Sequence, residues 1–424
     1  MTAPLTSSYW RQFAASTISN LGDGVNAAAM PLLAISLTDD ARLIAGVSFA
    51  SMLPWLLLSL PAGVWIDRWE RRRVMVVANT ARACLYATIA TLASLGLLGI
   101  WHLLCVLVIV GCCEVFFDMS AQAFLPSIVE ESQLTRANGL LYAVEVVANS
   151  FVGLPLGAWL FVAAVGVPFG INGASFALAA VLIASISPRV DSPSAATTPN
   201  NDSMPATPQA SSGSTSVSFV AQLREGLAWL WAHRTLRTLA ILLGVTNMCL
   251  TMGESIFVKF AFRYLEVGPR GYGLLLAAMS AGAIVGGLVG DRLARWMGAG
   301  VSVFVAYAIF AAADAVRAGF PNLAVVTVTS IVVALAGTVW NVVTVSYRQR
   351  IIPTELFGRV NSAYRFIGTG SIAIGALVGG QVAHHVGLRA PFFLASIVTA
   401  VALPWATIVM RDPEFTASHE RQPA

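Results

Sequence analysis

Long apolar stretches, each about as long as a bilayer is thick, follow one another along almost the whole chain and are separated by short polar segments. A helix that crosses a bilayer needs about 20 mostly apolar residues. We therefore expect an all-α membrane protein with twelve transmembrane helices. The predicted spans are 10–37, 43–66, 74–98, 102–125, 137–165, 168–187, 236–262, 271–290, 298–316, 323–347, 360–384 and 388–409. The first stretch is too long for the apolar region of a signal peptide and carries Asp23 in its middle, so it should remain as a span.

A polar segment divides the spans into two groups of six. Residues 191–216 have almost no apolar content and many Ser, Thr and Pro residues, which is typical of a disordered linker. After it, apolar residues recur at helical spacing and predict an amphipathic helix over 218–233 that lies along the inner membrane surface. The expected organisation is a six-helix bundle at 1–187, a linker region at 188–235, a second six-helix bundle at 236–411 and a tail at 412–424.

The two groups of spans repeat each other in sequence. Three pairs of segments match at nearly the same offset: 63–68 (GVWIDR) with 287–292 (GLVGDR) at 224 residues, and 136–138 (RAN) with 359–361 (RVN) and Gly157 with Gly380 at 223 residues. Two six-span halves joined by a long loop are an arrangement of secondary transporters, which bind substrate near the midplane between the halves. The pattern therefore predicts two pseudo-symmetric six-helix bundles around a central site.

Composition and charge agree with a membrane protein and also set its orientation. Apolar residues make up 57% of the chain, charged residues 11%, and the mean hydropathy is +0.75, whereas a soluble domain carries about 25% charged residues. Lys and Arg accumulate in cytoplasmic loops. With both termini cytoplasmic, 17 of the 25 basic residues lie inside and three within spans, and the outer loops hold Arg42, Arg263, Arg270, Arg317 and Arg389. The net charge of +4 follows from this topology, and no nucleic-acid partner is expected.

Several motifs resemble those of a known transporter superfamily. The stretch 63–73 (GVWIDRWERRR) resembles the loop signature that follows the second helix in the major facilitator superfamily. The stretches 78–83 (ANTARA), 224–237 (REGLAWLWAHRTLR) and 358–380 (GRVNSAYRFIGTGSIAIGALVGG) resemble the exporter branch that holds the enterobactin exporter and macrolide efflux proteins. The resemblance covers the whole chain and implies the twelve-helix major facilitator fold.

The resemblance also implies a gate around the first motif, which begins at Gly63. Asp67 lies where its carboxylate can accept hydrogen bonds from backbone N–H groups at the start of span eleven, near Gly358. Three arginines can then pair with carboxylates such as that of Asp118 while the cytoplasmic side is closed: Arg68, Arg71 and Arg72. The second copy of the motif places Asp291 and Arg292 at the corresponding point. The alternative is that the arginines only fix the topology of the loop.

Ionisable residues inside the spans are candidates for substrate and proton binding, because such residues are costly in a membrane and face a cavity or a partner. In the superfamily, spans one, four, seven and ten line the cavity. The candidate residues are Asp23, Asn26, Glu114, Glu145, Glu254, Trp340 and Asn341. The alternative is that the acids form structural ion pairs with Arg82, Lys259 or Arg365.

The sequence favours transport over catalysis. It contains no phosphate-binding Gly-x-x-x-x-Gly-Lys loop and no cluster at metal-ligand spacing, so neither ATP hydrolysis nor a cofactor is expected. We expect a monomeric exporter in a bacterial inner or cytoplasmic membrane that extrudes an amphipathic small molecule, such as a drug, siderophore or other secondary metabolite, by proton antiport. The alternatives are a lysophospholipid or lipid-like flippase of the same fold and a non-transporting membrane sensor or assembly partner.

Overall fold

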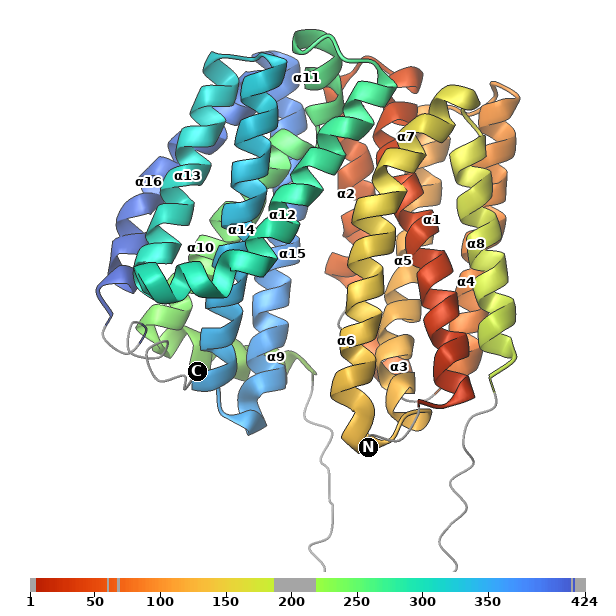
Figure 1. Cartoon of the computed structure of the whole chain (residues 1–424), viewed down its shortest axis with the longest axis horizontal. Helices are drawn as coiled ribbons and strands as arrows, with labels where there is room; N and C mark the ends of the chain where they lie inside the picture. The colour runs from red at the N-terminus through yellow and green to blue at the C-terminus, as the bar shows by residue number, and fades with distance from the viewer. Residues whose placement is uncertain (1–4, 59–60, 67–68, 187–218, 413–414, 416–424) are drawn as a thin grey trace, which may run out of the picture.

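The computed structural model describes residues 5–58, 61–66, 69–186, 219–412 and 415. Its helices run side by side in two bundles (Figure 1). The helices of the first bundle are α1 (Ser7–Leu37), α2 (Ala41–Leu58), α3 (Pro61–Ile66), α4 (Arg71–Ser94), α5 (Ile100–Phe124), α6 (Leu134–Glu145), α7 (Leu154–Ala163) and α8 (Val167–Ala184). A π-helical stretch, η3 (Val146–Gly153), joins α6 to α7, and two short 3₁₀ turns, η1 (Leu125–Ser127) and η2 (Glu131–Gln133), follow α5.

The second bundle repeats this order of long helices. Its elements are α9 (Phe219–Ala232), α10 (Arg234–Glu254), α11 (Phe257–Tyr264), α12 (Pro269–Met297), α13 (Ala299–Gly319), α14 (Leu323–Ile351), α15 (Thr354–His385) and α16 (Ala390–Met410). Across the bundles, α2 packs on α15 and α7 packs on α12. The start of α1 and the end of α16 lie at one end of the molecule, which we call the N/C end, and α11 lies at the opposite, far end (Figure 1).

The predicted spans match helices of membrane-spanning length. Within the described residues, eleven helical stretches are long and apolar enough to cross a membrane. The twelfth, α1, has 31 residues but a more polar composition. Its polar residues line a cavity inside the protein, which explains why the helix is less apolar than its neighbours.

Within the described residues, the fifth and seventh predicted spans are not regular α-helices throughout. The fifth span, predicted at 137–165, changes from α-helix to π-helix over Val146–Gly153 and back. The seventh, predicted at 236–262, ends as α10 at Glu254 and resumes as α11 at Phe257. Such interruptions are frequent at functional sites, because they alter which side chains a helix presents. Composition alone does not reveal them, since the apolar stretches continue unbroken.

The placement of three charged residues also differs from the prediction. Arg317 was expected in an outer loop, but it is buried in α13 at 7% exposure. Its guanidinium has polar partners in the interior, because it pairs with Asp314 at 3.3 Å and donates to hydroxyl groups on α14. Asp291 and Arg292 were expected after the eighth span but lie within α12, where Asp291 pairs with Arg295 at 2.5 Å.

The amphipathic helix after the linker is present as α9, and part of its apolar face packs on protein. Leu230 is fully buried in the core of the second bundle, whereas Trp231 is half exposed. The helix also contacts α15. The predicted disordered segment 191–216 lies outside the described residues.

Candidate functional site

A cavity of about 1200 Å³ lies in the interior and is lined mainly by the first bundle. It extends to the N/C end, where Leu125, Pro126 and Leu134 line it. The second bundle contributes Thr251 and Ile372, together with one carboxylate. The ionisable lining residues are Asp23, Arg82, Glu114, Asp118, Glu145 and Glu254. Among the described residues, five acids and one base therefore surround one space, and the acids include all four of the acids predicted from the spans.

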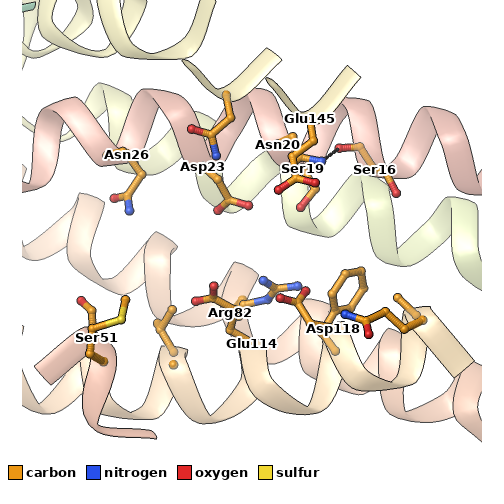
Figure 2. A pocket seen from close by; sticks show the side chains of 18 of the residues that line it. Ser16, Ser19, Asn20, Asp23, Asn26, Ser51, Arg82, Glu114, Asp118 and Glu145 are labelled. Carbon is orange, nitrogen blue, oxygen red and sulfur yellow. Dashed lines mark hydrogen bonds between the residues drawn. The ribbon is translucent and has the colours of Figure 1, made fainter. Parts of the chain in front are cut away.

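One wall of the cavity is the polar face of α1. Its residues recur at intervals of three or four, which places them on one side of a helix. They are Gln12, Ser16, Ser19, Asn20, Asp23 and Asn26 (Figure 2). The amide of Asn26 also donates to the hydroxyl group of Tyr86 at 2.9 Å, which ties this face to α4.

Glycines on either side of Asp23 fix the direction in which its carboxylate points. A methyl group added at Gly22 would lie 2.5 Å from the side-chain oxygen of Asn172 on α8, and one added at Gly24 would lie 2.7 Å from the Cα of Asn149 on η3. Both neighbours of Asp23 are therefore pressed against other helices. This close packing leaves Asp23 on the open side of α1, facing the cavity.

The opposite wall brings Arg82 of α4 beside Glu114 and Asp118 of α5 (Figure 2). Glu114 and Asp118 are four residues apart on one helix and so share a face. Arg82 was predicted as a member of a structural ion pair, but it makes no ion pair within 4 Å of any described carboxylate. Its guanidinium instead lies over the rings of Phe117 and Phe176, at 4.5 and 4.2 Å from their centroids.

The two remaining acids both lie where a regular helix is interrupted. Glu145 is the last residue of α6, directly before the π-helical stretch, and Glu254 is the last residue of α10, directly before the break that leads to α11. Both side chains are exposed to the cavity. Discontinuous helices commonly form the substrate and ion sites of transporters, which fits the position of both acids in the cavity wall.

Two predicted cavity residues are not part of this cavity. Trp340 is 6% exposed and packs in the apolar core of the second bundle, which corrects its proposed role in stacking on a substrate. Asn341 is exposed but does not line the cavity. The polarity of Asn341 and the aromatic ring of Trp340 suggested a lining role, but the rotation of α14 decides which face meets the cavity.

The predicted gate around the first motif is only partly described. Gly63 belongs to α3, whereas Asp67 and Arg68 lie outside the described residues. Arg71 donates to the carbonyl of Ala123 at 2.8 Å, and Arg72 donates to the carbonyl of Ile186 at 2.6 Å. In this conformation neither arginine pairs with Asp118, which lines the cavity instead. The expected pairing with Asp118, which was predicted for a closed cytoplasmic side, therefore stays a prediction.

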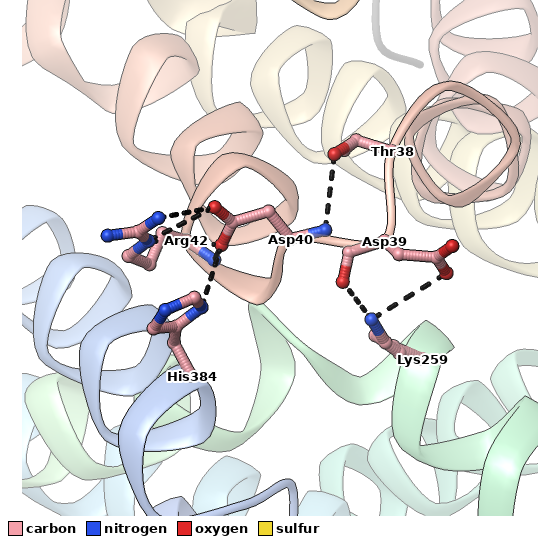
Figure 3. Close-up of polar contacts among 6 residues, drawn as sticks. All are labelled: Thr38, Asp39, Asp40, Arg42, Lys259 and His384. Atoms are coloured by element: carbon pink, nitrogen blue, oxygen red, sulfur yellow. Dashed lines mark hydrogen bonds and ion pairs between the residues drawn. The ribbon is translucent and has the colours of Figure 1, made fainter.

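Lys259 and Arg365 connect the two bundles. Lys259 of α11 pairs with Asp39, which follows α1, at 3.8 Å (Figure 3). The guanidinium of Arg365 on α15 lies 5.6 Å from the ring centroid of Trp55 on α2. Neither residue neutralises a cavity acid through an ion pair within 4 Å. The acids of the cavity therefore remain available to a ligand or a proton.

The prediction missed the cluster that holds the far end of the molecule closed. Asp40 accepts hydrogen bonds from Arg42 and lies 3.2 Å from Nδ1 of His384 on α15 (Figure 3). The hydrogen bonds from Arg42 lower the pKa of Asp40 to about 2. The adjacent acids Asp39 and Asp40 in a short outer loop were the available signal, but Lys259 and His384, their partners on the second bundle, lie more than 200 residues away in sequence.

Comparisons with known proteins place these features in context. The profile of the transmembrane secretion effector family matches residues 1–422. The multidrug efflux pump Tap of Mycobacterium tuberculosis is 28% identical over 403 residues, covering 92% of this chain and 89% of that protein. Macrolide efflux protein A of Streptococcus pyogenes is 22% identical over 378 residues, covering 86% and 87%. The solved structure of the nucleoside transporter NupG has a TM-score of 0.70 at 11% identity, covering 98% of this chain and 100% of that one, which shows a shared fold.

Proposed function

The chain belongs to the transmembrane secretion effector family of the major facilitator superfamily, and from this premise we propose that it exports small amphipathic molecules from the cytoplasm by proton antiport. The single observation that carries the proposal is the cavity, which reaches one end of the molecule and is lined by five carboxylates. The matched efflux proteins Tap and macrolide efflux protein A support export as the direction of transport.

The distribution of basic residues supports a cytoplasmic N/C end. Basic residues accumulate on the cytoplasmic side of membrane proteins, and the N/C end carries Arg11, the arginines at 71–73, Arg348 and Arg350. The cavity then opens to the cytoplasm, where a substrate for export enters. The far end, closed by Lys259–Asp39 and His384–Asp40, faces the outside.

The acids support coupling to protons. A carboxylate in a partly enclosed cavity changes protonation when its surroundings change, because burial favours its neutral form and a nearby cation favours its charged form. The interaction energy of two unit charges 4 Å apart is about 4 kcal/mol if the effective dielectric constant is about 20. A cationic substrate and a proton therefore compete for the same carboxylates, which supports their exchange at one site.

Transport by purified protein in liposomes tests the proposal. We expect an imposed proton gradient to drive a fluorescent cation such as ethidium against its concentration gradient, and Glu114→Gln to reduce this uphill transport strongly. Glu266→Gln is the matched control, because Glu266 is an exposed acid that does not line the cavity. Movement of labelled lysophospholipid without movement of ethidium would favour the lipid flippase, and movement of neither would favour a non-transporting role.

A further inference from the structure

Arg82 is the one cation among the described residues that line the cavity, where it faces five carboxylates. Its exposed fraction is 3%, so its charge lies in the wall and is nearly out of contact with solvent. A buried charge is costly unless an ion pair or hydrogen bonds compensate it, and Arg82 makes no ion pair within 4 Å of a described carboxylate. Its position therefore requires a physical explanation in terms of its neighbours.

Aromatic rings hold the guanidinium of Arg82 in place. It lies 4.5 Å from the ring centroid of Phe117 on α5 and 4.2 Å from that of Phe176 on α8. It also donates to the side-chain oxygen of Asn79, one turn earlier on α4. Rings attract a cation through their negative faces, and desolvation strengthens the attraction. Arg82 is therefore fixed from three sides without being neutralised by a carboxylate.

The geometry leaves the charge of Arg82 to act on the whole acid cluster. No described carboxylate lies within 4 Å of its guanidinium, and its Nε has no hydrogen-bond partner among the described residues. Glu114 and Asp118 lie beside it, and Asp23 lies across the cavity (Figure 2). A charge fixed at such a position contributes a constant positive potential to the space in which a ligand would lie.

We propose that Arg82 determines the charge specificity of the cavity by acting as a fixed internal cation. The inference rests on the proposed function, because it assumes that substrates bind in this cavity. Arg82 lowers the net negative charge that a ligand meets, so its own contribution opposes each positive charge on the ligand. Because this contribution is proportional to the ligand charge, a dication loses more of its attraction to the acids than a monocation of similar shape.

Coulomb's law makes the proposal quantitative, because the effect of a fixed charge is proportional to the ligand charge. Removing Arg82 leaves the binding of a neutral ligand unchanged, strengthens that of a monocation, and strengthens that of a dication by the square of the same factor. For a ligand charge roughly 10 Å from the guanidinium at an effective dielectric constant of about 20, this factor is about tenfold. A dication then gains about a hundredfold.

Three probes with one ring system separate charge from shape. Phenanthridine is neutral, ethidium carries one positive charge, and propidium carries two. Their dissociation constants are measured by fluorescence for wild type and for Arg82→Gln, which removes the charge. Arg82→Lys keeps the charge and is the matched control. A measurement at pH 8.5 limits proton uptake by the carboxylates, which would otherwise offset the loss of the cation.

We expect Arg82→Gln to tighten binding of propidium by about the square of the tightening for ethidium. Phenanthridine binding should not change in either variant, and Arg82→Lys should bind all three probes as wild type does. An equal change for all three probes, or no change for the charged pair, would overturn the proposal and leave Arg82 as a packing residue. If wild type binds none of the probes, the proposed export function itself fails. This outcome differs from failure of the Arg82 proposal alone, in which wild type binds the probes but Arg82→Gln does not change their relative affinities as expected.

Discussion

Lys259 and Asp39 join the two bundles at the far end of the molecule. The ammonium group of Lys259 donates to the backbone carbonyl of Asp39 and lies 3.8 Å from its carboxylate (Figure 3). Lys259 lies five residues after Glu254, beyond the break between α10 and α11. One interrupted helix therefore contributes a carboxylate to the cavity and a cation to the far-end closure.

Removing this contact should favour opening of the far end, and only slightly. Asp39 is fully exposed, and exposed ion pairs contribute about 0.2–1 kcal/mol. Lys259→Met should therefore shift the ratio of open to closed far ends by about five-fold or less, as measured by distances between spin labels on α7 and α11. Arg263→Met on the same helix is the control, and an equal shift in both variants would contradict a specific role for Lys259.

The neighbouring contact at Asp40 should resist acid. The hydrogen bonds from Arg42 lower the pKa of Asp40 to about 2, below its ordinary value of about 3.9. A carboxylate whose pKa is lowered by its partner stabilises the paired state when the pH is above the ordinary pKa of the carboxylate. This stabilisation is lost as the pH falls through the lowered pKa of about 2. The Asp40–Arg42 contact should therefore persist from pH 7 to pH 4. Asp40→Asn should loosen the far end at pH 7, whereas wild type at pH 4 should keep the distances between the spin labels on α7 and α11. Equal loosening in the two samples would argue against a role for the charge of Asp40 in closing the far end.

Gly380 should be required for closure of the far end. A Cβ atom at this position would lie 2.7 Å from the Cβ of Ala45 and 3.1 Å from the Cα of Arg42, both on α2. Gly380→Val should hold the bundles apart there, so that the far end stays open and transport falls severely while the protein remains in the membrane. Gly139→Val is a control, because an added Cβ there meets nothing within 4 Å. Normal transport by Gly380→Val would show that α2 and α15 separate without cost.

Asp23 should carry the coupling proton. A charged carboxylate on a lipid-facing helix costs roughly 2.5–3.5 kcal/mol, and Asp23 instead faces a polar cavity with Asn20 and Asn26 on the same face of α1. Asp23→Asn keeps shape and hydrogen bonding but cannot titrate. It should abolish uphill transport while allowing substrate to equilibrate downhill in liposomes. If the variant still concentrates substrate, the coupling group lies among Glu114 and Glu254.

The two copies of the loop motif should differ in importance. Asp291 pairs with Arg295 on its own helix, and both side chains are half exposed. The first copy has three consecutive arginines, and one of them, Arg71, reaches the end of α5 through the carbonyl of Ala123. Asp67→Asn and Arg71→Ala should therefore slow transport severely without reducing the amount of protein in the membrane, and Asp291→Asn should have a milder effect. Equal losses in Asp67→Asn and Asp291→Asn would indicate two equivalent gates.

The membrane spans could be predicted from sequence because a chain in lipid must satisfy its backbone hydrogen bonds within each segment. Every span is therefore a local feature of about 20 apolar residues. The polar face of α1 could be predicted for the same reason, since the spacing between Asn20, Asp23 and Asn26 is local. Carboxylates within apolar stretches, such as that of Glu114, also indicate a cavity or a buried partner, because the lipid does not solvate them.

The surroundings of each charge depended on the tertiary structure. Arg317 is stable inside α13 because Asp314 and two hydroxyl groups of α14 surround it, and Arg82 is fixed by rings on two other helices. Which end of the molecule is closed likewise depends on contacts such as Lys259–Asp39, whose two residues are 220 positions apart in sequence. Helix formation needs only neighbours along the chain, whereas burial and charge pairing depend on which distant helix faces turn toward each other.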